Sequence, residues 1–273
     1  MATKITKLSD DTFMLTDKFI RVNEFLLIGS ERALLLDTGY GSGLKEKVKK
    51  LTSLPVTVAN THLHPDHSNG NRLFDEIFVG EADLPSKGMP SNDLAKAVAT
   101  YYFINSRIPD AIIEKVLQYG LIRTGGEKYS PLWKSIDLGG RVIRTLPCPG
   151  HTPGCTLFLD EKNKWVFAGD TINPAFWAFT NPALTLIDYA RVWMRLQPEL
   201  EGYGKIFISH HSKPLDAGYV GAFIKNLLGT TLKDGKPSFI KGGTPQQVHI
   251  YKRRDEKYGN MAAWAYPSQV RKV

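Results

Sequence analysis

Residues 61–67 read Thr61-His62-Leu63-His64-Pro65-Asp66-His67, and four of these side chains can bind a metal ion. Histidines two positions apart on an extended segment point to the same side, because side chains alternate along a strand. Pro65 disfavours a helical backbone at His64 and so favours that conformation. Asp66 and His67 follow where we expect the chain to turn, and they can face a second metal. Three of the seven histidines lie here, which favours metal binding over a histidine-rich surface loop.

Three later segments offer further metal-competent side chains. Pro149-Gly150-His151-Thr152-Pro153-Gly154 places a histidine in a turn between two apolar runs. Val166-Phe167-Ala168-Gly169-Asp170 ends a strand-like run with a carboxylate, and Ile206-Phe207-Ile208-Ser209-His210-His211 ends another with imidazoles. A lone His or Asp in a turn is more often a cap or a hydrogen-bonding group. The order of the three segments behind the first motif indicates metal binding instead.

This ordered set resembles the metallo-β-lactamase superfamily of hydrolases. The resemblance is carried by the HxHxDH motif at 62–67, by His151, by Asp170 and by the histidine at 210 or 211, over about 150 residues. The run Leu34-Leu35-Leu36-Asp37-Thr38-Gly39 resembles the first motif of the family, an apolar strand that ends in Asp. An Asp-Thr-Gly triplet can also be half of an aspartic protease site, but that site needs a second copy, and the sequence has none. We therefore interpret Asp37 as a supporting residue.

The resemblance implies two metal sites. The first would be held by His62, His64 and His151, the second by Asp66, His67 and the terminal histidine, with Asp170 as the bridge. Imidazoles with a carboxylate suit zinc, two ions per chain, with iron or manganese as alternatives.

The terminal ligand is open between two neighbours. In related enzymes the ligand follows a small residue directly after the strand, and Ser209-His210 fits that pattern. His211 lies nearer to Pro214, and other members place the ligand a few residues before a proline. We prefer His210, which leaves His211 as a supporting or substrate-facing group.

The reaction implied by the resemblance is hydrolysis of a carboxylic ester-type bond, in a lactone, ester or thioester, by a metal-bound hydroxide. Asp66 is the predicted catalytic residue, which would orient the nucleophile and pass a proton. The alternatives are β-lactam hydrolysis, phosphodiester cleavage and a mononuclear iron dioxygenase. Asp170 argues against a β-lactamase, since the dizinc enzymes of that kind have a cysteine or no bridging carboxylate there. A binding module that has lost catalysis is disfavoured, because every ligand is retained.

The fold implied is α/β (α+β), a four-layer αββα sandwich that forms a single domain over residues 1–273. Apolar patterns predict helices over 44–51, 186–196 and 217–228, and strands over 56–60, 77–80 and 142–146. A helical insertion is predicted at about 85–135, with consecutive aromatic residues at Tyr101, Tyr102 and Phe103 that make a homodimer an expectation. Phe176, Trp177 and Phe179 follow Asp170 and predict either an apolar substrate wall or plain core packing. Residues 246–252 predict an added edge strand.

Composition narrows the class of protein. The sequence has 42% hydrophobic residues, enough for a substantial core, and no apolar run of 18 residues that would cross a membrane. The net charge of +8 is dispersed, which favours a solvated basic surface or the attraction of an anionic small-molecule substrate over nucleic-acid binding. The first residues lack the apolar core of a signal peptide, so a cytoplasmic location is expected. Cys148 and Cys155 are then expected to be free thiols and are not counted as ligands.

Overall fold

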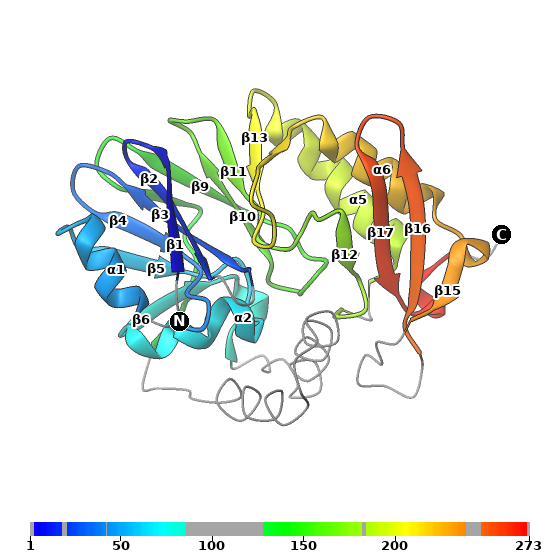
Figure 1. Ribbon diagram of the computed structural model, residues 1–273, viewed down its shortest axis with the longest axis horizontal. Helices are drawn as coiled ribbons and strands as arrows, with labels where there is room; N and C mark the ends of the chain where they lie inside the picture. The colour runs from blue at the N-terminus through cyan, green and yellow to red at the C-terminus, as the bar shows by residue number, and fades with distance from the viewer. Residues whose placement is uncertain are drawn as a thin grey trace.

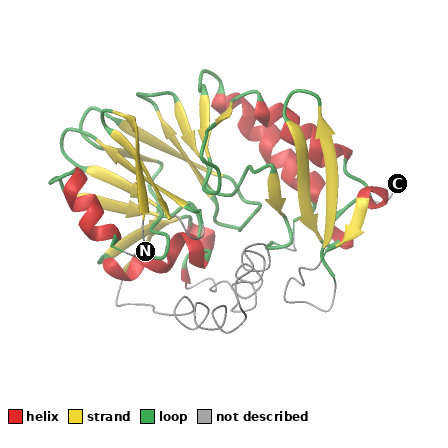
Figure 2. Cartoon of the chain, viewed as in Figure 1, coloured by secondary structure: helices red, strands yellow, loops and turns green. Residues whose placement is uncertain are grey.

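The computed structural model describes residues 3–17, 21–41, 43–85, 128–181, 184–238 and 247–271. Its elements form five layers, in which a helix, two facing β-sheets, a helix pair and a third β-sheet follow one another (Figures 1 and 2). The first four layers are the predicted αββα sandwich. The fifth layer was not predicted.

The first sheet contains seven strands in their order along the chain. They are β1 (Thr3–Ser9), β2 (Thr12–Asp17), β3 (Asn23–Ile28), β4 (Ala33–Leu36), β5 (Val56–Ala59), β6 (Glu76–Val79) and β7 (Lys128–Pro131). Strands β1 to β4 are antiparallel neighbours, whereas β4 to β7 run parallel. The sheet therefore changes from a meander to parallel crossovers at β4.

Both faces of the first sheet are covered, which explains why β4 reads as an unbroken apolar run. Leu34 and Leu36 pack in the core against the second sheet, while Leu35 on the other face packs against helix α1 (Leu44–Leu51). Helix α1 contributes Val48 to that contact, and its lysines lie on its solvent side. The helix has the bounds that its amphipathic pattern predicts.

The second sheet faces the first and has six strands. In spatial order they are β14 (Leu215–Asp216), β13 (Lys205–Phe207), β11 (Trp165–Phe167), β10 (Thr156–Asp160), β9 (Val142–Pro147) and β8 (Ser135–Asp137). Only β11 and β13 are parallel neighbours in this sheet. Aromatic rings join the sheets: the ring centroid of Phe25 in the first sheet lies 4.9 Å from that of Phe167 and 5.7 Å from that of Phe207 in the second.

Helices α5 (Leu186–Leu196) and α6 (Tyr219–Gly229) lie between the second sheet and the third. The third sheet has the spatial order β12 (Ala175–Trp177), β17 (Gly259–Ala265), β16 (His249–Asp255) and β15 (Gly235–Pro237). The prediction of an edge strand at 246–252 is therefore wrong: β16 is an inner strand of a separate sheet. The cause is the pairing of β16 with β17 on one side and with β15 on the other, which sequence periodicity does not reveal.

Short helical turns complete the described elements. They are α2 (Pro65–Ser68) and the 3-10 helices η1 (Asn69–Leu73), η2 (Glu81–Asp83), η4 (Gln197–Leu200), η5 (Leu232–Asp234) and η6 (Pro267–Gln269).

Most of the predicted helical insertion, with Tyr101, Tyr102 and Phe103, lies outside the described residues. The end of its predicted range is strand: residues 128–131 form β7, at the edge of the first sheet. Among the described helices, none has the length and apolar character needed to cross a membrane.

Parallel strands of the two facing sheets end at the same edge of the sandwich. Strand β5 leads there to His62, β11 leads to Asp170, and β13 leads to His210. Ligand sites in sheets of this kind form at the carboxyl ends of parallel strands. The topology therefore brings residues together that are distant in sequence.

Away from that edge, a buried guanidinium ties the two sheets together. The Arg141 side chain is 1% exposed and donates to the carbonyl oxygens of Asp11 and Ile28, at 2.8 and 3.1 Å, and to Thr12 Oγ1 at 2.7 Å. These three acceptors flank the strands of the first sheet. On the second sheet, Arg141 Nη2 lies 2.5 Å from Asp160 Oδ2, whose side chain is fully buried.

We predict that Arg141→Met lowers the free energy of unfolding by about 3–5 kcal/mol, because it leaves the Asp160 carboxylate buried without its cation. Lys162→Met is the matched control, since Lys162 pairs with Asp11 at 2.6 Å but its side chain is 54% exposed, and such a pair contributes less than about 1 kcal/mol. Urea denaturation measures both. Equal effects of the two substitutions would contradict the proposed tie.

Candidate metal centre

The Asp37 carboxylate positions the segment that carries the HxHxDH motif, through hydrogen bonds to Thr61 and His67. Asp37 follows β4 with φ of 61°, a left-handed conformation that Asp tolerates better than most residues. Its Oδ1 accepts from the Thr61 backbone N–H and its Oδ2 from Thr61 Oγ1, both at 2.8 Å. Oδ2 also lies 2.9 Å from His67 Nδ1. Asp37 therefore directs His67 Nε2 away from itself, as the supporting role predicted for it requires.

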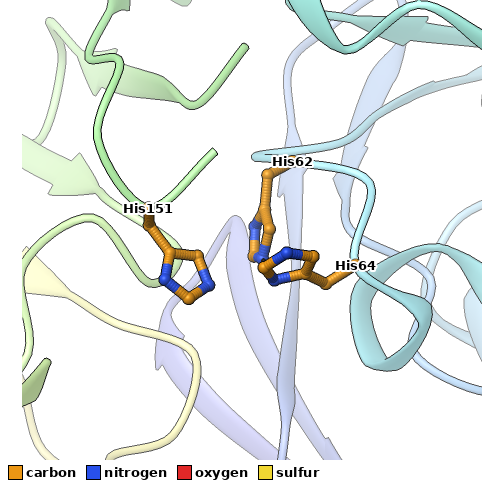
Figure 3. Close-up of side chains that lie close together, drawn as sticks. All are labelled: His62, His64 and His151. Atoms are coloured by element: carbon orange, nitrogen blue, oxygen red, sulfur yellow. Dashed lines mark hydrogen bonds between the residues drawn. The ribbon is translucent and has the colours of Figure 1, made fainter. Parts of the chain in front are cut away.

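His62 and His64 lie on the loop after β5 and point to the same side (Figure 3). His64 has φ −64° and ψ 148°, the extended conformation that Pro65 predicts. Thr61 Oγ1 lies 3.1 Å from His62 Nδ1, and since this hydroxyl donates to Asp37, it accepts from the ring. His62 Nε2 is therefore the unprotonated nitrogen of this ring, and it lies 3.0 Å from His64 Nδ1.

His151 approaches these two rings from the second sheet (Figure 3). Its ring centroid lies 4.9 Å from that of His62 and 4.6 Å from that of His64. His151 Nδ1 donates to the backbone oxygen of Trp177 at 3.0 Å. Within the described part of the chain, the buried Nε2 has no hydrogen-bond partner. The three imidazoles thus present one nitrogen each to a common point.

A second group lies directly beside the first. His210 Nε2 lies 3.2 Å from Asp66 Oδ2 and 3.3 Å from Asp170 Oδ2. His67 Nε2 lies 3.5 Å from that same oxygen of Asp66 and 3.6 Å from that of Asp170. His151 Nε2 is 3.8 Å from Asp170 Oδ2, so the Asp170 carboxylate stands between the two groups.

Glycine at position 169 allows that placement of Asp170. Gly169 has φ of 54°, and a Cβ there would collide with Thr61 Oγ1. The turn after β11 can therefore approach the Thr61-His62 segment only because residue 169 lacks a side chain.

The two groups differ in protonation. Burial lowers the pKa of His62 and His64 well below the usual value, with the neighbouring imidazoles acting in the same direction. Burial likewise lowers the pKa of His151. For His67 and His210, burial is outweighed by the nearby carboxylates, which raise the pKa of His67 well above its usual value and that of His210 to about 9. The first group is therefore neutral at pH 7, and the second holds protons that a cation would replace.

The carboxylates are ionised despite their burial. Burial opposes ionisation of Asp66, but His67 and His210 bring its pKa down to about 2. Burial also opposes ionisation of Asp170, and His210 and His67 hold its pKa well below the usual value. The site therefore offers many donor atoms, and the charge of its two carboxylates becomes available to a cation that displaces the protons of His67 and His210.

These residues fit divalent cations. Among the described residues, three buried ligand atoms of the cluster lack a hydrogen-bond partner, namely His67 Nε2, His151 Nε2 and Asp170 Oδ1. Orphaned buried polar atoms are costly, and coordination to a cation would satisfy them. The groups that could hold an ion, with ligand atoms within 4.8 Å of one another, are His62-His64-His151, His62-His67-Asp170 and Asp66-His67-His210. Nitrogen and carboxylate donors of this kind suit zinc.

The structure distinguishes the two neighbouring histidines at the end of β13. His210 lies in the cluster, whereas the exposed His211 lines the adjoining pocket. Asn23 Nδ2 donates to the backbone oxygens of Ile208 and His211, at 3.1 and 2.8 Å, and so holds this loop to the first sheet. The geometry therefore places His210, and not His211, among the candidate ligands of the described residues.

A pocket of about 290 Å³ opens beside the cluster. His64, Asp66, His151, Asp170 and His210 form one side of its lining, and Asn173, Pro174, Ala175, Trp177 and His211 are its other described residues. In the aromatic segment after Asp170, Trp177 lines this pocket, whereas Phe176 and Phe179 are buried in the core.

Supporting residues of His151 were not predicted. Thr180 Oγ1 donates to the backbone oxygen of His151 at 2.5 Å, and Asp83 accepts from Thr152 Oγ1 at 2.6 Å and from Gly154 N–H at 2.7 Å. These contacts cross between loops and leave no periodic signal in the sequence. Cys148 and Cys155 are free thiols, as predicted; both are buried, and neither belongs to a candidate metal group of the described residues.

Residues 18–210, more than half of the chain, match the family described as the metallo-beta-lactamase superfamily. The chain belongs to this superfamily of metallo-hydrolases, as the fold and the cluster indicate.

Individual proteins that are similar to this chain share less than a third of its residues over the matched segments. The chain is 26% identical to acyl-coenzyme A thioesterase MBLAC2 of Homo sapiens over 69% of this chain and 73% of that protein. It is 24% identical to glyoxylase B2 of Dictyostelium discoideum over 72% and 65%. A solved metallo-beta-lactamase from Pontibacter korlensis superposes with a TM-score of 0.58 at 17% identity, covering 84% of this chain and all of that one, which shows the shared fold.

We predict that Asp37→Asn weakens metal binding about 10- to 100-fold, because a neutral amide orients His67 less firmly than the carboxylate does. Asparagine also tolerates the left-handed backbone of this position, so the fold is retained. Competition with a chromophoric chelator measures the affinity. Asp137→Asn, an exposed residue of the second sheet, is the control, and equal affinities of the two variants would contradict the role of Asp37.

Metal binding to the second group should release protons. The raised pKa values of His67 and His210 mean that these rings hold protons at pH 7.5 in metal-free protein, and a cation must displace them. We expect zinc affinity to rise with pH until about pH 9, where His210 loses its proton unaided. Calorimetric titrations in buffers of different ionisation enthalpy measure the release. Affinity that is independent of pH would contradict this assignment.

Proposed function

We propose that this protein is a metal-dependent hydrolase of carboxylic ester-type bonds, with acyl thioesters as the first candidates. The observation that carries the proposal is the convergence of five imidazoles and two carboxylates in one cluster, part of which lines a pocket. A purely structural cluster would be expected to satisfy its own donors and acceptors, whereas this one leaves ligand atoms without partners among the described residues.

The ligand sets proposed for the two cations are those of the sequence analysis. His62, His64 and His151 would hold one ion, Asp66, His67 and His210 the other, and Asp170 would contact both. Bound there, two divalent cations would supply an ionised water at neutral pH and polarise the carbonyl of the substrate. Zinc is the proposed metal, because the set is rich in nitrogen donors.

Side chains and backbone groups of the protein transfer protons during the reaction and orient the histidine rings. Asp66 faces the pocket as a carboxylate, so it can accept a proton from the nucleophile during attack and return it to the leaving group. Asp37 and Thr61 fix the rings of His67 and His62, and the Trp177 carbonyl fixes the ring of His151. Fixed orientation lowers the reorganisation needed in the transition state.

Two considerations favour a thioester among the ester-type bonds. The relative matched over the larger share of its own length is named as an acyl-coenzyme A thioesterase, although at 26% identity. The pocket also combines the polar cluster with apolar residues that suit an acyl group, namely Pro174, Ala175 and Trp177.

The test is a substrate panel measured with and without chelator. It contains an acyl thioester, an aromatic lactone, a penicillin, a phosphodiester and a persulfide, each offered to zinc-loaded protein. We expect the thioester to be hydrolysed with the highest kcat/KM, and chelation to abolish the activity. Preference for the penicillin or phosphodiester, or oxygen consumption with the persulfide by iron-loaded protein, would overturn the proposal.

We predict that Asp66→Asn lowers kcat about 10²- to 10⁴-fold, the usual contribution of a general acid–base group. Bound metal is measured on the same sample by elemental analysis, so that loss of the second ion is distinguished from loss of proton transfer. Asp75→Asn, at an exposed position directly before β6, is the matched control. Full activity of Asp66→Asn with both ions bound would refute the role.

A further inference from the structure

The third sheet combines a strand of the family region, residues 18–210, with strands from beyond it. Strand β12 belongs to that region, whereas β15, β16 and β17 all follow residue 210. Strand β12 pairs in parallel with β17, with Trp177 opposite Trp264. The segment after the family region therefore determines how β12 is presented to the pocket.

The two faces of β12 serve different purposes because side chains alternate along a strand. Phe176 points to the helices, where its ring stacks on that of Tyr189 at 4.6 Å between centroids. Ala175 and Trp177 point the other way, and both line the pocket beside the metal cluster. Trp177 packs at its side against Phe179, with 5.1 Å between centroids. The outer face of β12 therefore forms an apolar wall of the pocket.

The segment beyond the family region also holds the chain that follows β12. The backbone N–H groups of Ala178 and Phe179 donate to the Trp264 oxygen, at 2.8 and 3.1 Å. The Gln269 side chain is buried, and its Nε2 lies within 2.9–3.1 Å of three backbone oxygens, those of Ala178, Asn181 and Leu184. The backbone next to this apolar wall is therefore held in place by hydrogen bonds to Trp264 and Gln269.

The same strand also fixes a candidate ligand. The Trp177 side chain lies on the outer face of β12 and lines the pocket, and the Trp177 backbone oxygen accepts a hydrogen bond from His151 Nδ1. The distance from the wall to the cluster is thereby set by one residue. An apolar group held on that wall would place an attached carbonyl at the cluster, which is the requirement for attack.

We propose that the outer face of β12, carried by the third sheet, binds the hydrocarbon part of the acyl group and sets the acyl-chain specificity of the enzyme. Trp177 is the specificity-determining residue and Ala175 leaves room beside it. The proposal rests on the proposed function, since it assigns a subsite to the same thioester. It predicts that selectivity for acyl length resides in these two side chains.

The test compares acetyl and octanoyl thioesters of one thiol on zinc-loaded wild type, Trp177→Ala and Ala175→Trp. Trp177→Ala should lower kcat/KM for the octanoyl substrate at least about tenfold more than for the acetyl substrate, mainly through KM. Ala175→Trp, at an exposed position, should exclude the octanoyl chain by filling its space. Trp133→Ala, a tryptophan that is 49% exposed and does not line this pocket, is the matched control.

Binding of a non-hydrolysable octyl thioether of the same thiol, measured by calorimetry, gives a readout that does not depend on turnover. We expect its Kd to rise at least about tenfold in Trp177→Ala with unchanged zinc content. Equal losses for both acyl lengths, or an unchanged thioether Kd, would overturn the subsite. If wild type hydrolyses no thioester yet binds the thioether through Trp177, the proposed reaction fails and the apolar subsite stands.

Discussion

Ionised carboxylates and imidazoles that share one buried space form the constraint on which the rest of this protein depends. Asp66 and Asp170 stay charged at the edge of the sandwich only because imidazoles surround them, and three of the ligand atoms still lack partners among the described residues. Burial of such groups is unfavourable unless a cation neutralises them. A divalent ion resolves this conflict at both groups, and the surrounding chain is arranged to present the ligand atoms to it.

The sandwich lowers the conformational entropy that is lost when an ion binds to this arrangement. Each ligand follows the end of a strand whose position is fixed by a buried core, so that few dihedral angles remain to be ordered when an ion binds. Asp37, Gly169 and the Trp177 carbonyl then fix the remaining freedom, through a carboxylate, a close backbone approach and a hydrogen bond. The supporting contacts come from different layers, which couples the metal centre to the whole fold.

Sequence reasoning reached the candidate ligands because their chemistry is local. The HxHxDH spacing and the conformation forced by Pro65 are visible within seven residues, and the extended backbone at His64 agrees with them. The bounds of α1 and α5 followed from apolar periodicity, whereas the αββα layers were implied by the resemblance to the superfamily. Asp37 was identified as a supporting residue because it ends an apolar strand.

The third sheet and the contacts of His151 could not be read from the sequence. The pairing of β12 with β17 joins residues about 87 positions apart, as with Ala175 and Ala262, and no local pattern encodes such a partner. Gln269, Asp83 and Thr180 are polar residues in turns, which sequence reasoning assigns to solvent by default. Their roles depend on which carbonyl or amide groups the fold leaves unpaired, and that is a property of the tertiary structure.

The most direct measurement is the metal content of the intact chain, by native mass spectrometry of protein purified without added metal and after zinc titration. The account predicts two divalent ions per chain at saturation, and one fewer when His210 is replaced by alanine. A chain that remains metal-free at saturating zinc, or that binds the same number of ions without His210, would contradict it.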